Sequence, residues 1–303
     1  MDVLCIGHAA WDISVFVEGY PAENSKSEIR TMLECGGGPA ANAACLLSRW
    51  GVSCGIAAAI GADPYGDRIA EEFLAAGTDI TLLERSPTNV TPMSVIIVNE
   101  HNGSRSIINR KAAGSGEPFR LSSAAMPDPP PRLLLFDGHE LQASLQAMEL
   151  FPNAKTILDA GSLRDGTREL AKRVDYLVSS ERFACQMTGL PDLESPENQA
   201  KALAALYEYN RYPVVITRGE WEILFGYMDR IARFPTFPVT AVDTTGAGDI
   251  FHCAFAYAVL TETSVERGLR LAAAAAALSV TVRGGRTSIP SLAEVQEMLR
   301  DAG

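Results

Sequence analysis

The residues best suited to chemistry form one short segment, Asp243-Thr244-Thr245-Gly246-Ala247-Gly248-Asp249. Two glycines flanking an alanine permit a tight turn that points successive N–H groups into one concavity, and such a concavity binds anions. Apolar residues then recur at helical spacing, which predicts a helix from about Asp249. An anion-binding turn beside a carboxylate suits removal of a proton from a hydroxyl while charge on a transferring phosphoryl group is stabilised. A lone Gly-x-Gly-Asp is also typical of a strand-to-helix turn capped by the Asp.

A second segment, Glu34-Cys35-Gly36-Gly37-Gly38-Pro39-Ala40-Ala41-Asn42, combines three glycines with a helix start. The glycines permit close approach by a ligand or by backbone. Pro39 suits the first position of a helix and Gly51 the position after its end, so we expect a helix from Pro39 to Trp50 with Asn42 in its first turn. The segment is consistent with a ligand-binding loop and also with an ordinary junction between a loop and a helix.

These segments resemble the C-terminal signature and the N-terminal glycine-rich motif of the ribokinase-like (PfkB) carbohydrate kinases, and the resemblance extends over essentially the whole chain. It implies that Asp249 is the catalytic base. It also implies that the amides of Gly246, Ala247 and Gly248 form the anion hole.

On the sugar side, the resemblance implies that two glycines, an Asn and an acidic residue near the N-terminus bind hydroxyl groups. Without the family, the acidic residue would be interpreted as a solvated loop residue. His139, in Asp137-Gly138-His139-Glu140, aligns where many related kinases carry an Arg, and it is consistent with a substrate contact or with a plain loop position. The candidate substrate-binding residues are Asp12, Gly37, Gly38, Asn42, Lys26, Asn109 and His139.

On the nucleotide side, Thr217-Arg218-Gly219 follows an apolar run and predicts a polar loop facing phosphates, or else a simple β-turn. The arginine pair Arg283 and Arg286 suggests an anionic ligand, although surface arginines commonly have no such role. The resemblance places the adenine near the alanine-rich helix, at Ala273. The candidate cofactor-binding residues are Ser180, Thr217, Gly219, Thr245, Gly246, Gly248 and Ala273.

The stretch Ser180-Glu181-Arg182-Phe183 departs from the family's usual Asn-x-x-Glu motif, which is linked to Mg²⁺ and phosphate. Glu181 is a candidate substitute, and the metal ligands stay unassigned. The same departure, together with Gly36–Ala41 and Gly284-Gly285-Arg286, is similar to ketohexokinase-like and sulfofructose-kinase-like members. The resemblance implies ATP and Mg²⁺ as cofactors and leaves open a monovalent cation such as K⁺.

Short apolar runs alternate with helical patterns, which predicts an α/β fold with a mostly parallel sheet covered by helices on both faces. The resemblance implies the ribokinase-like version, three α/β/α layers with a small β lid. Ligands then bind at the carboxyl ends of the strands. The expected strands are Val3–Ile6, Gly55–Ile60, Leu133–Phe136, Thr156–Leu158, Tyr176–Val178 and Val214–Thr217. Expected helices include Pro39–Trp50, Asp67–Ala76, Leu141–Leu150, Glu181–Thr188, Asp249–Thr261, Ser264–Arg283 and Leu292–Leu299.

Two segments break this alternation and predict a separate, mainly antiparallel sheet. Residues 12–34 contain runs with period-two alternation, and residues 92–112 contain a hairpin around Asn102-Gly103, a strong turn pair. We therefore expect one kinase domain over residues 1–303 with a lid built from these two segments. The resemblance implies that the lid covers the sugar and mediates a homodimer.

Composition excludes several classes of function. The chain has 303 residues and a net charge of −11, which argues against nucleic acid as a partner. It lacks a P-loop, a Gly-x-Gly-x-x-Gly after the first strand, and zinc-ligand spacing. No apolar run is long enough for a membrane span, and no signal peptide is visible. The six cysteines form no Cys-x-x-Cys pair, so we expect buried free thiols and a cytoplasmic location.

We therefore predict an ATP- and Mg²⁺-dependent sugar kinase, a phosphotransferase with an alcohol group as acceptor, with a ketohexose-type sugar favoured. One alternative is a nucleoside kinase of the same fold. Another is a weakly catalytic sugar- or nucleotide-binding regulator. The retained Asp249 argues against the regulator, because a pure binder has no need of a base beside an anion hole.

Overall fold

The computed structural model describes residues 1–111, 118–122, 126–228 and 230–302, and a nine-stranded sheet forms its centre. The strand order is β13-β12-β11-β10-β9-β8-β1-β4-β5. Neighbouring strands from β11 to β5 are parallel, and β12 and β13 extend the sheet antiparallel at one edge. The strands are β1 (Val3–Ile6), β4 (Cys54–Gly61), β5 (Asp79–Ser86), β8 (Leu133–Phe136), β9 (Lys155–Ala160), β10 (Tyr176–Ser180), β11 (Val214–Arg218), β12 (Trp221–Tyr227) and β13 (Arg230–Phe234).

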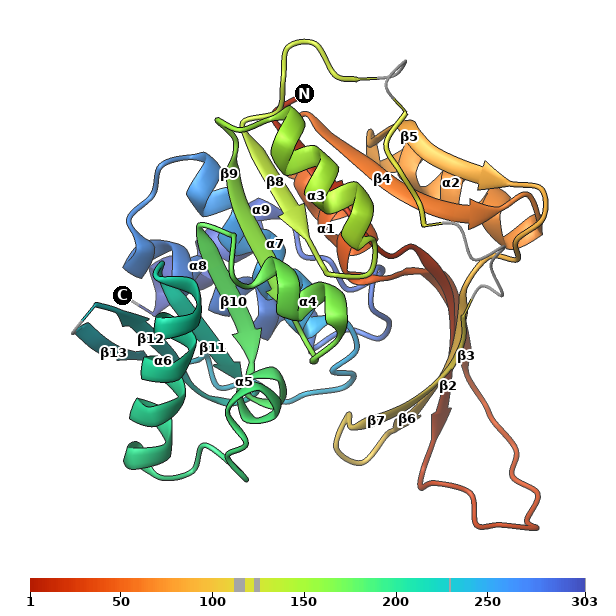
Figure 1. Cartoon of the computed structure of the whole chain (residues 1–303). Coiled ribbons are helices and arrows are strands. Elements are labelled where there is room, and N and C mark those ends of the chain that lie inside the picture. The colour runs from red at the N-terminus through yellow and green to blue at the C-terminus, as the bar shows by residue number, and fades with distance from the viewer. Residues whose placement is uncertain (112–117, 123–125, 229, 303) are drawn as a thin grey trace.

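Alternating side chains of β1 face two cores on opposite faces of the sheet. Val3 and Cys5 join a cluster with α1, α7 and α8, whereas Leu4 and Ile6 join a cluster with α3, α4 and α6. Figure 1 shows the second group of helices in front of the sheet and the first group behind it, so the fold has the expected three layers. The helices are α1 (Pro39–Arg49), α2 (Pro64–Ala76), α3 (Leu141–Leu150), α4 (Asp165–Leu170), α5 (Glu181–Thr188), α6 (Pro196–Asn210), α7 (Ala247–Leu260), α8 (Val265–Ser279) and α9 (Leu292–Asp301).

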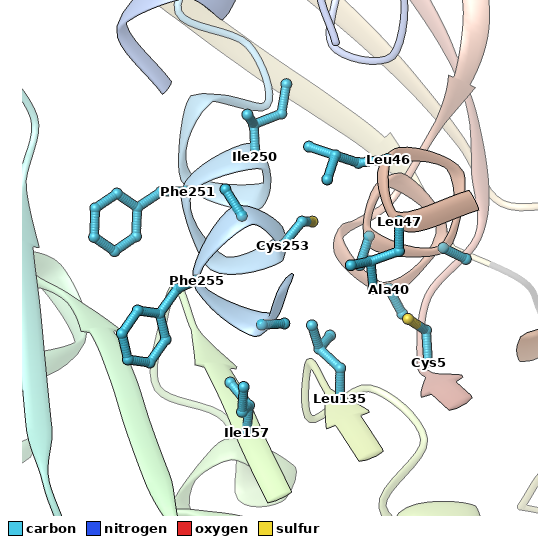
Figure 2. Close-up of a cluster of buried hydrophobic side chains, with 14 of the residues drawn as sticks. Cys5, Ala40, Leu46, Leu47, Leu135, Ile157, Ile250, Phe251, Cys253 and Phe255 are labelled. Carbon is cyan, nitrogen blue, oxygen red and sulfur yellow. The ribbon is translucent and has the colours of Figure 1, made fainter. Parts of the chain in front are cut away.

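Helix α7 is buried along most of its length, which fixes the position of its N-terminus. Cys253 points toward Leu46 of α1, whereas Phe255 points away from α1 (Figure 2), and its ring centroid lies 5.7 Å from that of Tyr176 on β10. Burying one phenylalanine side chain contributes about 1.5–3 kcal/mol. The apolar body of α7 therefore anchors the polar turn that precedes it.

A second, four-stranded sheet lies beside the main one, in the order β3-β2-β6-β7 (Figure 1). Its strands are β2 (Ala10–Val17), β3 (Met32–Gly37), β6 (Met93–Asn99) and β7 (Arg105–Arg110). Strands β6 and β7 lie within the expected lid segment 92–112, whereas β2 begins before the expected segment 12–34 and β3 ends after it. Residue 112, the last of those segments, lies outside the described residues. Phe16, Ile96 and Val98 form a small buried cluster on one face of this sheet.

The sequence patterns did not predict β5, β12 or β13, and they placed two helix ends at other residues than the structure does. Helix α2 begins at Pro64, earlier than expected, because the Asp63 side chain accepts hydrogen bonds from the amides of Tyr65 and Gly66. Helix α8 ends at Ser279, before the β-branched residues that follow. All six cysteines are free thiols. Within the described residues, no helix is both long and apolar enough to cross a membrane.

Candidate active site

The Asp243–Asp249 segment forms the turn into α7. Gly246 caps the helix in a left-handed conformation, with φ 75° and ψ 0°, which favours glycine. The helix begins at Ala247, and the first amides of a helix have no acceptor within it. A Cβ on Gly248 would meet no described atom within 4 Å, so this side of the turn is open to a ligand. The geometry therefore suits an anion at the start of α7.

A buried carboxylate, that of Asp243, holds this turn in place. It accepts a hydrogen bond from the amide of Thr245 at 2.9 Å and another from the amide of Gly284 at 2.8 Å. Gly285 packs against the turn so closely that a Cβ on Gly246 would lie 3.1 Å from its Cα. The loop after α8 thus supports the anion-binding turn from behind.

Asp249 lies in the first turn of α7, and its carboxyl has the character of a base. Burial and the nearby charge of Asp159 raise its pKa from 3.8 to about 7. A hydrogen bond from Asn42 and the charges of His252 and Arg105 oppose this rise. General-base catalysis is most effective when the pKa lies near the working pH. These surroundings make the Asp249 carboxylate a better proton acceptor than an ordinary aspartate.

Asn42 connects α1 to this carboxyl. Its Nδ2 donates to Oδ2 of Asp249 at 2.7 Å, and its Oδ1 accepts from Nε of Arg286 at 3.3 Å. Arg286 is almost fully buried and pairs with Glu72 at 2.7 Å. The sequence suggested a ligand-facing role for this arginine; the structure places it behind the site, among protein groups.

The glycines at the end of β3, just before α1, lie in a strand rather than in the expected loop, and they leave room for Asp12 of β2. A Cβ on Gly37 would lie 1.9 Å from Oδ2 of Asp12, and one on Gly38, whose φ is 98°, would lie 2.4 Å from the carbonyl oxygen of His8. Asp12 is 8% exposed, and burial raises its pKa. The structure thus brings Asp12 and both glycines to one place, next to the helix that carries Asn42.

The strand register brings a further candidate to the same face of the second sheet. Asp12 pairs with Ser94, and Ser94 with Asn109, so side chains of the three residues share one face. Lys26, by contrast, lies in the loop between β2 and β3, which extends away from the main sheet in Figure 1. The structure does not bring Lys26 to the other candidates.

His139 follows β8 and belongs to a histidine pair that the sequence did not reveal. Its ring stacks on that of His8, with centroids 4.5 Å apart. Nδ1 of His139 lies 3.2 Å from Oδ1 of Asp137, a buried carboxylate. Burial alone would raise the pKa of Asp137, but the charge of His139 and hydrogen bonds from both histidines hold it well below its ordinary value. The pair lies at the carboxyl ends of β1 and β8, where ligands bind.

The nucleotide candidates lie along the carboxyl ends of β10 and β11. Ser180 pairs with Thr217 in the strand register, and the hydroxyl of Thr217 donates to the carbonyl of Ser179 at 3.3 Å. Gly219 follows with φ 63°, in an exposed turn. Ala273, on α8, is buried in the core cluster and presents little surface.

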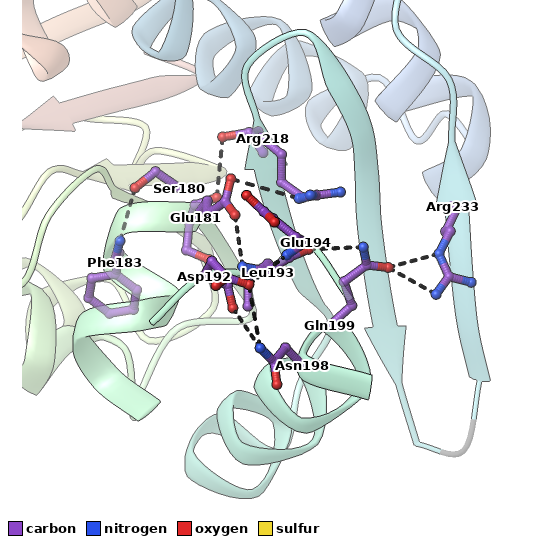
Figure 3. A network of polar contacts seen from close by, with 12 residues as sticks. Ser180, Glu181, Phe183, Asp192, Leu193, Glu194, Asn198, Gln199, Arg218 and Arg233 are labelled. Carbon is purple, nitrogen blue, oxygen red and sulfur yellow. Dashed lines mark hydrogen bonds and ion pairs between the residues drawn. The ribbon is translucent and has the colours of Figure 1, made fainter. Parts of the chain in front are cut away.

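Glu181, the candidate substitute for the family's usual acidic ligand, contacts protein groups (Figure 3). Its Oε1 accepts from the amide of Leu193 at 3.0 Å, and its Oε2 lies 3.8 Å from Nε of Arg218. Phe183, at the motif's last position, is fully buried. Within the ranges that the structure describes, no three His, Cys, Asp or Glu side chains are grouped to hold a metal.

The tip of the β6–β7 hairpin reaches the anion-binding turn, a contact the sequence did not indicate. The hydroxyl of Thr244 donates to the carbonyl of Gly103 and accepts from Nη1 of Arg105, both at 2.8 Å. Arg283, from the loop after α8, pairs with Glu100 at 2.5 Å. The second sheet is therefore joined to the turn that precedes α7 and Asp249.

The chain is similar to known sugar kinases over nearly its whole length. It is 28% identical to a ribokinase of Haemophilus influenzae over 274 residues, covering 88% of each chain. It is 26% identical to a fructokinase of Escherichia coli over 288 residues, covering 88% of this chain and 92% of that one.

Solved structures show the same fold. A ribokinase from Thermotoga maritima superimposes with a TM-score of 0.83 at 26% identity and covers 99% of both chains. A ribokinase from Arabidopsis thaliana, complexed with ribose and ATP, gives 0.82 at 26% identity, covering 99% of this chain and 98% of that one.

The family model for pfkB family carbohydrate kinases matches residues 1–292. A carboxyl with a raised pKa beside an open helix N-terminus is compatible with phosphoryl transfer to an alcohol. This chain belongs to the pfkB family of carbohydrate kinases and is a phosphotransferase with an alcohol group as acceptor.

Proposed function

We propose that this enzyme transfers the γ-phosphoryl group of ATP to a hydroxyl of a small sugar, with Asp249 as the base. The observation that carries the proposal is the geometry of Asp249: it lies in the first turn of α7, beside the open amides, and its carboxyl accepts a hydrogen bond from Asn42 at 2.7 Å. At the start of this helix, a base that can accept the proton of the acceptor hydroxyl lies beside a turn that can bind the phosphoryl group. The two can therefore serve one reaction.

In the proposed reaction, Asp249 accepts the proton of the sugar hydroxyl as its oxygen bonds to the γ-phosphorus. The bond from that phosphorus to the bridging oxygen breaks, and ADP leaves with the bonding electrons. The amides of Gly246, Ala247 and Gly248 stabilise charge on the transferring group. The second sheet acts as a lid that excludes water, and its contact with Thr244 supports this role.

The proposed sugar site consists of Asp12, Gly37, Gly38, Asn42, Asn109 and His139, with the nucleotide along Ser180, Thr217, Gly219 and α8. Carboxylate and amide groups suit a polyhydroxylated acceptor, because each hydroxyl both donates and accepts. We favour a ketohexose-type sugar, and the likeness to a fructokinase supports this class. The similarity to ribokinases supports a pentose equally, and a nucleoside remains the alternative acceptor.

The side chains near the proposed nucleotide site suit a metal ion that enters with the nucleotide better than one bound by protein ligands alone. Mg²⁺ keeps several waters and binds through substrate phosphates and one or two carboxylates. The carboxylate of Glu181 is committed to Leu193 and Arg218, so phosphate oxygens would be the main ligands. Bound Mg²⁺ would neutralise phosphate charge during transfer. Replacing K⁺ with Na⁺ in the assay tests whether the enzyme requires K⁺.

We further propose a homodimer formed through the outer face of the lid. Alternation along the strands places apolar side chains on the face opposite Asp12. They are Ile13, Val15, Met32, Val95, Ile97 and Ile108. The six free thiols fit a reducing compartment, and we propose the cytoplasm.

A panel of acceptors tests the proposal. ADP release is measured with fructose, other ketohexoses, ribose, deoxyribose and adenosine at saturating ATP. Phosphorylation of a ketohexose with the highest kcat/KM supports the favoured class. Efficient turnover of adenosine with no hexose activity would favour the nucleoside kinase. Binding of a sugar without any ADP release above background would favour the regulator.

A further inference from the structure

Asn42 contacts Arg286 and Asp249, which carry opposite charges, and these two contacts fix the orientation of its amide group. Nε of Arg286 lies 3.3 Å from Oδ1 of Asn42, and Nδ2 of Asn42 lies 2.7 Å from Oδ2 of Asp249. A guanidinium can only donate, so it can face only the amide oxygen. The amide nitrogen must then face Asp249, where it too can only donate.

Arg286 is itself held in place from several sides. Its side chain is 1% exposed; Nη1 pairs with Glu72 at 2.7 Å and Nη2 donates to the carbonyl of Gly37 at 3.3 Å. Its guanidinium lies 5.1 Å over the ring of Phe73. A Cβ on Gly36 would lie 1.8 Å from Nη1, so this glycine makes the position of the guanidinium possible.

We propose that Arg286 is a positioning residue that fixes the amide of Asn42 as a donor and thereby keeps the base ionised. The inference rests on the proposed role of Asp249. With a freely rotating amide, a protonated Asp249 could donate to Oδ1 of Asn42 as readily as an ionised Asp249 accepts from Nδ2. Arg286 excludes the first arrangement, which leaves the ionised form with the better partner.

The groups around Asp249 set the direction of the effect. Asp159 on β9 disfavours the ionised carboxyl, whereas His252 on α7 and Arg105 on β7 favour it. Burial and Asp159 raise the pKa of Asp249 to about 7, although the hydrogen bond from Asn42 on α1 lowers it. Loss of that hydrogen bond would therefore raise the pKa of Asp249 further. A rise of about one unit lowers the ionised fraction at pH 7 about fivefold and leaves activity at pH 9 nearly unchanged.

Two variants of Arg286 separate orientation from packing. Lysine can only donate, so Arg286→Lys still directs the amide oxygen of Asn42 toward itself. Glutamine both donates and accepts, so Arg286→Gln lets the amide rotate. Both variants lose the planar pairing with Glu72, but lysine keeps a positive charge beside it, so Arg286→Gln should be the less stable of the two. The measurements are kcat/KM from about pH 5.5 to about pH 9, with the sugar that the wild type phosphorylates best, and the thermal unfolding midpoint.

We expect the acidic midpoint of kcat/KM to rise by about one pH unit in Arg286→Gln and to stay near the wild-type value in Arg286→Lys. Gly36→Ala gives the same test if Arg286→Gln does not fold, because it displaces the guanidinium and keeps its charge; the midpoint should again rise. Equal losses at every pH with an unchanged midpoint would overturn the proposal. A wild-type profile without an acidic limb, or one that persists in Asp249→Asn, would instead refute the role of Asp249.

Discussion

At the scale of single residues, Asp249 shows how one environment sets both reactivity and protonation. Its pKa of about 7 makes the carboxylate a stronger base than an ordinary aspartate. Asp249→Asn keeps the size and the contact with Asn42 but cannot accept the proton. We expect kcat to fall by roughly 10²–10⁴-fold, with nucleotide affinity nearly unchanged. Steady-state ADP release and nucleotide titration measure both; turnover within a few fold of wild type would remove Asp249 from the role.

The same substitution should change how stability depends on pH. The carboxyl titrates near pH 7 in the folded chain, above its ordinary value of 3.8, so the folded state binds this proton more tightly than the unfolded state. Between about pH 4 and pH 7, this carboxyl therefore lowers the free energy of unfolding as the pH rises. Asparagine does not titrate. We expect Asp249→Asn to have a higher Tm than the wild type at pH 8 and the same Tm near pH 4; thermal unfolding at both values decides.

Asp12 offers a test of the sugar site. Removing a carboxylate that accepts hydrogen bonds from sugar hydroxyls leaves those hydroxyls without a partner under the closed lid. This costs about 1–3 kcal/mol. Asp12→Ala should raise the KM for the sugar roughly ten- to a hundredfold and change the KM for ATP little. Glu18→Ala, which alters an exposed carboxylate just beyond the same strand, is the control. A rise in both KM values would indicate general damage rather than a sugar contact.

At the scale of elements, two glycines at the start of α7 have different physical roles. Gly246 needs its positive φ, whereas Gly248 has an ordinary backbone conformation and open space around it. Gly248→Ala should therefore fold with an equal or higher Tm, because alanine favours helix. Its methyl group should crowd the phosphate and lower kcat at least about tenfold. Gly19→Ala, also in open space, should leave kcat unchanged; normal turnover in Gly248→Ala would contradict the anion hole.

The sequence predicted this element well because its signals are local. Glycine spacing and apolar periodicity placed the start of α7 within two residues, period-two alternation located β2, and the Asn102-Gly103 turn located the hairpin of β6 and β7. Strands β12 and β13 were missed because their antiparallel pairing at one end of the sheet departs from the alternation of strands and helices, and because β13, Arg230–Phe234, carries a mixed pattern. The start of α2 was missed because Asp63 gains its capping role from two amides that follow it.

At the scale of the whole molecule, the site depends on contacts that no local pattern contains. Asn42 and Asp249 are 207 residues apart, and Arg286 and Asn42 are 244 apart. These pairs meet because α1 and α7, which are far apart in the sequence, pack side by side on one face of the main sheet. Motifs identified the residues on both sides, whereas the hydrogen bonds between them required the fold.

The quaternary state can also be tested at this scale. The outer face of the lid carries Ile108, 62% exposed, beside the apolar residues of β2 and β6, and a second copy would cover them. Ile108→Lys should abolish the dimer in light scattering and lower activity, because the lid of each subunit loses its support. Leu74→Lys on α2 changes a side chain of similar exposure, 61%, away from the lid, and should leave both unchanged. A wild-type monomer at micromolar concentration would contradict the proposed interface. A dimer that persists in Ile108→Lys would place the contact elsewhere on the molecule.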